Sequence, residues 1–247
     1  MKAIVLAAGY ATRLYPLTLD KPKPLLEVGG RPILGRLLDQ LAEIDGLDTV
    51  YVVTNSKFAR QFETFARDLD HKPFALRIVD DGTESDETKL GAIGDLDLVI
   101  RQEGIEDDLL VAAGDSIFDE APLADFARFA VDKEAPAIAL YDVGDLEAVK
   151  EYSAVTVDDA GRMLEMTEKP DDPQTTLAGI ALYVYPRSVL PLVRQYVEEG
   201  NNADQPGRLV QWLYTRVPVY AWRVPGRWFD IGSKETLAAA DREFAQS

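Results

Sequence analysis

A run of small and apolar residues near the start of the chain constrains its fold more than any other stretch. Residues 3–8, AIVLAA, contain no polar side chain, which is typical of a strand buried on both faces. Three prolines between residues 16 and 24 exclude a helix in the loop that follows. Apolar residues then recur at helical spacing over residues 33–41, with Pro32 in the first turn. A buried strand followed by a glycine-bearing loop is a frequent way to build a phosphate site.

The opening segment is basic, although the chain as a whole is acidic. The 247 residues include 26 Lys+Arg and 43 Asp+Glu, which gives a net charge of −17. Residues 1–38 contain six basic and two acidic residues. A basic island in an acidic chain favours a local anion pocket over a nucleic-acid surface. Charge alone leaves a second interpretation open, in which this loop is a solvated surface with scattered charges.

The remaining composition narrows the kinds of site that the chain can build. Cysteine is absent, which excludes disulfides and thiolate ligands, and the one histidine, His71, lies in a predicted surface loop. A metal would therefore be held by oxygen atoms, which favours Mg²⁺. No apolar run approaches about 18 residues and no signal peptide is visible, so we expect no membrane span and a cytoplasmic protein. The sequence leaves open whether the chain forms a homo-oligomer.

Strands and helices alternate through the first half of the chain. Ser56 is expected to cap the helix after the second strand. This alternation predicts an α/β fold with a mostly parallel, doubly wound (Rossmann-like) sheet and helices on both faces. The predicted strands are 49–54, 76–79, 109–113 and 135–141, and the predicted helices are 57–68, 90–101 and 122–132.

The second half changes character and predicts a small antiparallel extension. Short strands at 155–157 and 163–167 flank a turn with two aspartates and a glycine, which is typical of a hairpin. No linker rich in Gly, Ser or Pro separates the halves, so we interpret residues 1–247 as a single domain. The other predicted elements are strands at 177–185 and 219–223 and helices at 187–199, 209–215 and 234–244.

Two aspartates stand out by their surroundings. Asp115 follows the apolar strand LLVAAG, at the end where open α/β sheets bind ligands. Asp230 lies in the apolar segment WFDIG, where a carboxylate is costly to bury unless it is paired or binds a metal. Either residue could instead cap a helix, Asp115 before Phe118 and Asp230 before Lys234. The residues alone leave metal binding and helix capping equally open.

The basic loop carries a family signature. LAAGYATRLYPLTLDKPKPLLEVGGRPIL resembles the signature of the sugar-phosphate nucleotidylyltransferases, LAAGxGTRLxPLTxxxPKPLLxVxGxPxL, with Arg13 and Lys23 at the family's spacing. Ala11 is a departure, because the family more usually has a second glycine there and alanine tolerates positive φ poorly. Gly114-Asp115 and residues 228–233 resemble the two metal-binding aspartate motifs of the family.

The resemblance implies a reaction and a role for each motif residue. The enzyme would convert a nucleoside triphosphate and a sugar 1-phosphate to an NDP-sugar and pyrophosphate. The resemblance favours a hexose 1-phosphate as the sugar substrate. Lys23 would hold the α-phosphate and the attacking phosphate, and Arg13 would stabilise the departing pyrophosphate. Asp115 and Asp230 would hold Mg²⁺ as the cofactor. The implied nucleotide-binding residues, in a nucleotide-binding half of about 1–120, are Leu6, Ala8, Gly9, Thr12, Arg13, Lys23, Leu90, Gly91 and Asp115.

The second half, about 121–247, would bind the acceptor. Glu168-Lys169-Pro170 resembles the EKP element of the family, whose glutamate bonds sugar hydroxyls and whose lysine contacts the sugar phosphate. Ser153 stands where many relatives have glycine, and residues 92–95, AIGD, differ from the commoner TAGA, so the sugar and the base stay open. The implied acceptor-binding residues are Tyr152, Glu168, Lys169, Gly179 and Trp228.

Two other functions compete with this one. A cytidylyltransferase for a non-sugar phosphate such as phosphocholine would need an aromatic cage for the cation. A non-catalytic nucleotide-sugar sensor is the alternative outside enzymes, and the presence of all the charged residues assigned above to the reaction argues against it. The aromatic candidates for a cage are Tyr152, Trp212, Tyr214 and Trp228.

Overall fold

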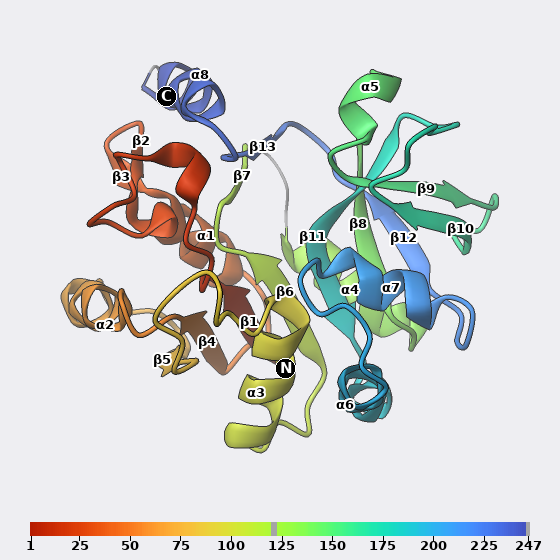
Figure 1. Ribbon diagram of the computed structural model, residues 1–247. Coiled ribbons are helices and arrows are strands. Elements are labelled where there is room, and N and C mark those ends of the chain that lie inside the picture. The colour runs from red at the N-terminus through yellow and green to blue at the C-terminus, as the bar shows by residue number, and fades with distance from the viewer. Residues whose placement is uncertain (120–122, 246–247) are drawn as a thin grey trace. The chain divides into compact units, whose positions relative to one another are not determined.

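The computed structural model describes residues 1–119 and 123–245, and the chain divides into two compact units (Figure 1). Unit 1 comprises Met1–Leu90, Ala112–Ala124 and Gly226–Ser247. Unit 2 comprises Gly91–Val111 and Asp125–Pro225. The last part of the chain therefore belongs with the first part and not with the residues that precede it.

Unit 1 is built on a parallel sheet, as the alternating pattern predicts. Its strands are β1 (Lys2–Leu6), β4 (Thr49–Thr54) and β5 (Ala75–Asp80), with β4 in the middle. All six residues of β4 are buried, which agrees with the apolar run Val50–Val53 at its centre. A helix follows β1 and another follows β4, and these are the crossovers that parallel neighbours require.

The helices of unit 1 begin close to where the sequence predicts. The first, α1 (Ile33–Leu41), directly follows Pro32 and buries its apolar stripe. The second, α2 (Ala59–Asp68), begins later than predicted and is not capped by Ser56, whose hydroxyl instead donates to Asp80 Oδ1 at 2.7 Å. The unit also contains α8 (Lys234–Phe244), which has the predicted bounds, and the 3-10 helices η1 (Thr12–Leu14) and η2 (Lys23–Leu25).

Unit 1 also contains two short antiparallel ribbons that the sequence does not predict. The Asp241 carboxylate of α8 accepts the N–H of Gly29 at 2.8 Å, so the end of the chain packs on the turn of one ribbon. Figure 1 accordingly shows the blue α8 beside the red and orange β2 and β3. The ribbons pair β2 (Glu27–Val28) with β3 (Arg31–Pro32), and β7 (Ser116–Phe118) with β13 (Trp228–Asp230).

Unit 2 contains the antiparallel strands predicted for the second half. The predicted hairpin consists of β9 (Ser153–Val157) and β10 (Met163–Glu168). Strand β9 also pairs with β11 (Leu177–Tyr185). Strand β8 (Ala137–Asp142) pairs antiparallel with β11 and parallel with β12 (Tyr220–Arg223). The predicted α/β class, parallel first and antiparallel later, is therefore confirmed.

Short helices complete unit 2. The helix predicted over 122–132 is α4 (Leu123–Lys133), which begins at the end of unit 1, and its predicted first residue, Pro122, lies outside the described residues. None of the helices in the described part of the chain is long and apolar enough to cross a membrane. Strand β6 (Leu109–Ala113) runs from unit 2 into unit 1. The remaining helices are α3 (Ala92–Gln102), α5 (Leu146–Val149), η3 (Arg187–Val189), α6 (Leu190–Glu198) and α7 (Gly207–Leu213).

Candidate active site

The loop between β1 and α1, residues 7–32 (the signature loop), begins where β1 ends. A fully buried asparagine, Asn55, holds this point, because its Nδ2 donates to Ala8 O at 2.8 Å. Its Oδ1 accepts the N–H of Phe58 at 3.2 Å, which fixes the side chain. The next residue of the loop, Gly9, is exposed. Asn55 is not among the predicted site residues, and the signal for it is a polar residue directly after the apolar strand TVYVVT.

Ala11 adopts the left-handed conformation in which the signature more usually has glycine. Its φ is 49° and its ψ is 44°, a region that costs a non-glycine residue about 1–2 kcal/mol. The Ala11 carbonyl accepts the hydroxyl of Thr18 at 2.8 Å, which holds this strained turn in place. Immediately after it, η1 presents Thr12 and Arg13, both of them exposed.

Lys23 and Asp115 form an ion pair in unit 1. Lys23 Nζ donates to Asp115 Oδ2, and the two side chains are 17% and 25% exposed. Just before Asp115, Gly114 N donates to Leu6 O at 2.9 Å, so the aspartate lies near the end of β1. Burial lowers the pKa of Lys23, but the attraction and hydrogen bond of Asp115, with Asp230 adding, outweigh it and raise that pKa above its ordinary value of 10.5. Lys23 is therefore a cation at neutral pH.

Asp230 is brought to Asp115 by the β7–β13 ribbon. Asp230 pairs with Ser116, the residue after Asp115, and the N–H of Ile231 donates to Asp115 O at 3.2 Å. The indole N–H of Trp228, a predicted acceptor residue, donates to Ser116 Oγ at 3.2 Å within the same ribbon. Antiparallel pairing therefore assembles two aspartates that are far apart in the sequence.

Neither aspartate caps a helix, so the capping interpretation is wrong for both. Helix α8 is capped by Ser233, whose hydroxyl accepts the N–H of Thr236 at 3.1 Å in a capping box. Asp115 precedes strand β7 and not a helix. The two carboxylates instead lie beside Lys23.

These two carboxylates are a small ligand set for a metal. Within residues 1–119 and 123–245, no group of three or more His, Cys, Asp or Glu is arranged to hold a metal ion. Mg²⁺ commonly takes only one or two protein carboxylates and completes its shell with water and substrate phosphates. Asp115 and Asp230 therefore fit a Mg²⁺ that is bound together with a nucleotide better than a metal caged by protein.

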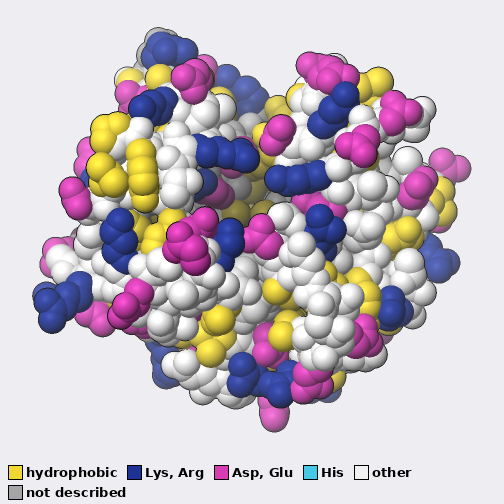
Figure 2. Space-filling model, in the orientation of Figure 1, with side chains coloured by type: hydrophobic (Ala, Val, Ile, Leu, Met, Phe, Trp, Pro, Cys, Tyr) yellow, Lys and Arg dark blue, Asp and Glu magenta, His cyan; other side chains and the backbone are white. Residues whose placement is uncertain are grey.

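The surface of the molecule carries mixed charge. Figure 2 shows acidic and basic side chains interspersed over one face of the molecule. Several basic side chains of unit 1 are paired, including Arg31 with Asp39 and Arg227 with Asp119. Arg13 differs, because it forms no ion pair with any residue that the structure describes. Its exposed guanidinium is therefore suited to an anionic ligand.

The predicted Leu90-Gly91 pair lies where the chain passes from unit 1 into unit 2. Leu90 is 39% exposed, and helix α3 begins only after Gly91. Gly91 is buried and has a φ of 80°, a conformation that favours glycine. The N–H of Ile93 donates to Ala203 O at 2.9 Å, which anchors the first turn of α3 in unit 2.

Four of the predicted acceptor residues come together in unit 2. Glu168 lies opposite Ser153 in the β9–β10 pair, and Ser153 lies opposite Gly179 on β11. The N–H of Lys169 donates to Tyr152 O at 2.8 Å. Lys169 is exposed and has a φ of 47°, so the chain turns sharply as it leaves β10. The pairing of β9 with both β10 and β11 thus brings positions 153, 168 and 179 next to one another.

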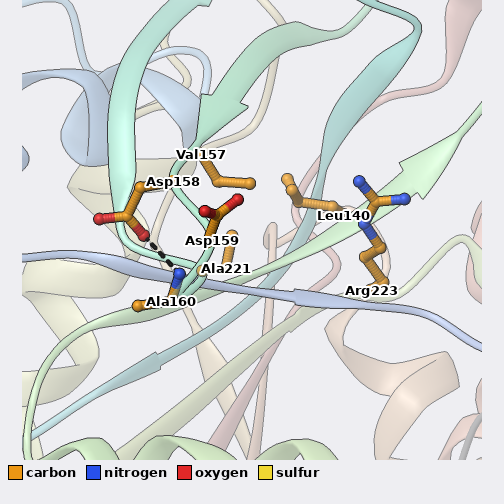
Figure 3. A pocket seen from close by; sticks show the side chains of 8 residues that line it. Leu140, Val157, Asp158, Asp159, Ala160, Ala221 and Arg223 are labelled. Atoms are coloured by element: carbon orange, nitrogen blue, oxygen red, sulfur yellow. Dashed lines mark hydrogen bonds between the residues drawn. The ribbon is translucent and has the colours of Figure 1, made fainter.

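A hollow of about 460 Å³ in unit 2 lies at the turn of the same hairpin (Figure 3). Leu140 and Val157 supply apolar walls, and Asp159 and Arg223 supply charge. Asp158 also lines it, but its Oδ1 accepts the N–H of Ala160 at 2.9 Å and so holds the turn. None of the predicted site residues lines this hollow.

The chain is similar to known proteins over its whole length. Residues 2–247 match the family model described as nucleotidyl transferase. The chain is 31% identical to the UTP–glucose-1-phosphate uridylyltransferase AglF of Haloferax volcanii, over 100% of this chain and 97% of that protein. It is 25% identical to the bifunctional protein GlmU of Methanocaldococcus jannaschii, over 98% of this chain but only 54% of that protein. A UDP-glucose pyrophosphorylase crystallised with UDP-glucose has the same fold, with a TM-score of 0.84 at 20% identity over 99% and 98% of the two chains.

Proposed function

The chain belongs to the nucleotidyl transferase family, and from that premise we propose that it transfers a nucleotidyl group from a nucleoside triphosphate to a hexose 1-phosphate. The observation that supports this most is the group formed by Lys23, Asp115 and Asp230 at the end of β1. It combines a partly buried ammonium group with two carboxylates, which suits phosphates and a divalent cation together.

The reaction needs no nucleophile from the protein. An oxygen of the sugar 1-phosphate attacks the α-phosphorus of the triphosphate, a new phosphorus–oxygen bond forms, and the bond to pyrophosphate breaks. Catalysis then consists of positioning and charge neutralisation. Lys23 would donate to the α-phosphate and to the attacking phosphate, and the exposed Arg13 would bind the departing pyrophosphate.

Mg²⁺ is part of this proposal. Asp115 and Asp230 would hold the ion, which when bound neutralises phosphate charge and orients the two substrates. Lys23 Nζ is hydrogen-bonded to the Asp115 carboxylate in this structure. Binding of the metal and nucleotide would therefore require the ammonium group to move from this carboxylate to a phosphate. The aspartates would remain as the fixed part of the site, because the paired β7–β13 ribbon holds their backbone.

We assign the acceptor to unit 2, in line with the predicted division of labour. Glu168 would accept hydrogen bonds from sugar hydroxyls, and the exposed Lys169 would contact the sugar phosphate. Tyr152 and Gly179 would flank the sugar. UTP and glucose 1-phosphate are the first pair to test, because the relative AglF bears that name and matches over almost its entire length.

The phosphocholine alternative has less support from the aromatic residues. Trp212, one of its four expected cage walls, is already covered by Arg216, whose guanidinium lies 3.7 Å from the ring centroid. Tyr196 meets the same indole edge-on at 5.7 Å between centroids. A ring that already carries a cation is a poor wall for a second one.

A screen of pyrophosphate release tests the proposal. The purified chain is incubated with Mg²⁺, each of the five common nucleoside triphosphates, and glucose, mannose or galactose 1-phosphate or phosphocholine. We expect release only when a triphosphate and a hexose 1-phosphate are both present. Pyrophosphate release from a triphosphate with phosphocholine, but with none of the sugar phosphates, would favour the cytidylyltransferase. Tight binding of a nucleotide sugar without any pyrophosphate release would favour the sensor.

A further inference from the structure

A buried serine lies against the carboxylate that we assign to the sugar. Ser153 is 3% exposed, and its Oγ donates to Glu168 Oε2. The two residues face each other directly across the β9–β10 pair, so the contact is set by strand register. Glu168 is half-buried, and no donor in the described ranges is bonded to its other oxygen, Oε1.

Helix α7 closes the other side of this pair. A β-carbon at Gly207, the first residue of α7, would lie 2.7 Å from Ser153 Oγ and 3.1 Å from Glu168 Cδ. Such distances are too short for ordinary contact, so only glycine leaves room for the hydrogen-bonded pair. One turn later, Gln211 Oε1 accepts the N–H of Glu168 at 3.1 Å. The same helix thus holds the backbone of Glu168 and confines its carboxylate.

We propose that Ser153 is a positioning residue, which orients Glu168 so that its carboxylate accepts a hydrogen bond from a single hydroxyl of the acceptor sugar. This inference rests on the proposed function and adds the way in which that site selects its sugar. A carboxylate can accept hydrogen bonds on both oxygens, and two neighbouring sugar hydroxyls could use one each. Ser153 uses one lone pair of Oε2, and the close approach of Gly207 crowds the other side of that oxygen, so Oε1 is the oxygen that stays open to the sugar.

The consequence is discrimination between epimers. Two hexose 1-phosphates can differ only in the direction of one hydroxyl. With Oε1 fixed, that hydroxyl points at the oxygen and donates a hydrogen bond in one epimer, and points away from it in the other. A site that hydrogen-bonds one hydroxyl in a set direction rejects sugars that cannot supply it, because the carboxylate is then left unpaired. An alanine at position 153 would supply no hydroxyl, so it would leave both oxygens of the glutamate to the sugar.

Steady-state kinetics with three sugars test this role. Wild type and Ser153→Ala are compared with glucose, mannose and galactose 1-phosphate at saturating nucleoside triphosphate. For the preferred sugar we expect the acceptor KM to rise about tenfold, the effect of one hydrogen bond to a charged group, with kcat and the nucleotide KM nearly unchanged. The preference among the three sugars should narrow by about the same factor. Thr156→Ala, which removes a hydroxyl from the same strand, is the matched control and should change none of these values.

Gly207→Ala provides a second, independent perturbation. Its methyl group should push the carboxylate away from Ser153, so it should also raise the acceptor KM and narrow the preference, and the double variant should add little to either single one. Thermal unfolding shows whether each variant is folded. The proposal is overturned if Ser153→Ala is active with unchanged preference, or if it loses activity equally with every sugar, as a purely structural role would require. A wild type that turns over no hexose 1-phosphate would overturn the proposed function, and this inference with it.

Discussion

The two candidate sites surround their carboxylates in opposite ways. In unit 1, Asp115 lies against the ammonium group of Lys23, with a second carboxylate next to it. In unit 2, Glu168 lies against the neutral hydroxyl of Ser153. Charges attract phosphates and metal ions from many directions, whereas a hydroxyl held against one carboxylate oxygen fixes a direction. The comparison suggests that unit 1 is suited to neutralising the charge of transfer and unit 2 to distinguishing sugars.

The largest expected effect is loss of the carboxylates in unit 1. Asp115→Asn and Asp230→Asn should each lower turnover about 10³-fold, because each removes a charged ligand while it keeps the shape of the side chain. EDTA should abolish the activity of the wild type. Circular dichroism checks that the variants are folded, and a Mg²⁺ titration measures the loss.

Asp39→Asn is the matched control for these variants. Asp39 is paired with Arg31 and Lys72 in unit 1 but has no assigned role in the reaction, so its variant should remain active. Folded Asn variants at positions 115 and 230 that remain active at ordinary Mg²⁺ would show that the charges of this site do not serve the reaction.

The cations of the signature loop come next. Lys23→Ala and Arg13→Ala should each lower kcat about 10²-fold, the scale expected when one charge-stabilising donor is removed. Lys21→Ala is the control, because Lys21 lies in the same loop and its ammonium group pairs only with Glu27, at 3.7 Å, among the residues that the structure describes. Near-normal turnover of both the Lys23 and the Arg13 variants would mean that the loop is a solvated surface.

A smaller and more selective effect is expected in unit 2. Glu168→Gln should lower kcat/KM for the acceptor about tenfold and leave the nucleotide KM unchanged, because only the sugar contact is weakened. Lys169→Ala should raise the acceptor KM through loss of a phosphate contact. Glu165→Gln, at an exposed position of the same strand, should do neither. If Glu168→Gln instead loses nucleotide affinity with normal acceptor kinetics, the division between the units is wrong.

The smallest expected effect concerns the strained turn of the signature loop. Ala11→Gly should relieve the left-handed conformation but increase the entropy of the unfolded chain, for a net gain of at most about 1 kcal/mol. The corresponding rise in Tm is about 2 °C for a chain of this size. Ala11→Val should lower Tm, because a β-branched side chain tolerates positive φ worse still. A glycine variant less stable than the wild type would contradict this reading of the turn.

The sequence predicts long periodic elements well and short paired ones poorly. The predicted bounds of β4, β6 and α8 match the structure, because an unbroken run of four or five apolar residues, or three helical turns, gives a clear pattern. The three-residue strands β7 and β13 have no such pattern. Periodicity therefore could not bring Asp115 and Asp230 together, and only the family resemblance suggested that they share a site.

The contacts of Glu168 could not be predicted from the sequence, for a related reason. The predicted hairpin strands, 155–157 and 163–167, end just short of Ser153 and Glu168, so the pairing of these two residues was not expected. Gly207 gave no signal at all, because its role is to leave space beside a side chain that is 39 residues earlier in the chain. Close approaches of this kind depend on tertiary packing and not on local pattern.

The most direct measurement follows the α-phosphorus itself. A nucleoside triphosphate labelled at that atom is incubated with the chain, Mg²⁺ and the hexose 1-phosphate selected by the screen, and the products are separated. We expect label to appear in an NDP-sugar in the same amount as the pyrophosphate released, and we expect Lys23→Ala to slow both together. Label recovered only as nucleoside monophosphate, or pyrophosphate released without the sugar, would contradict it.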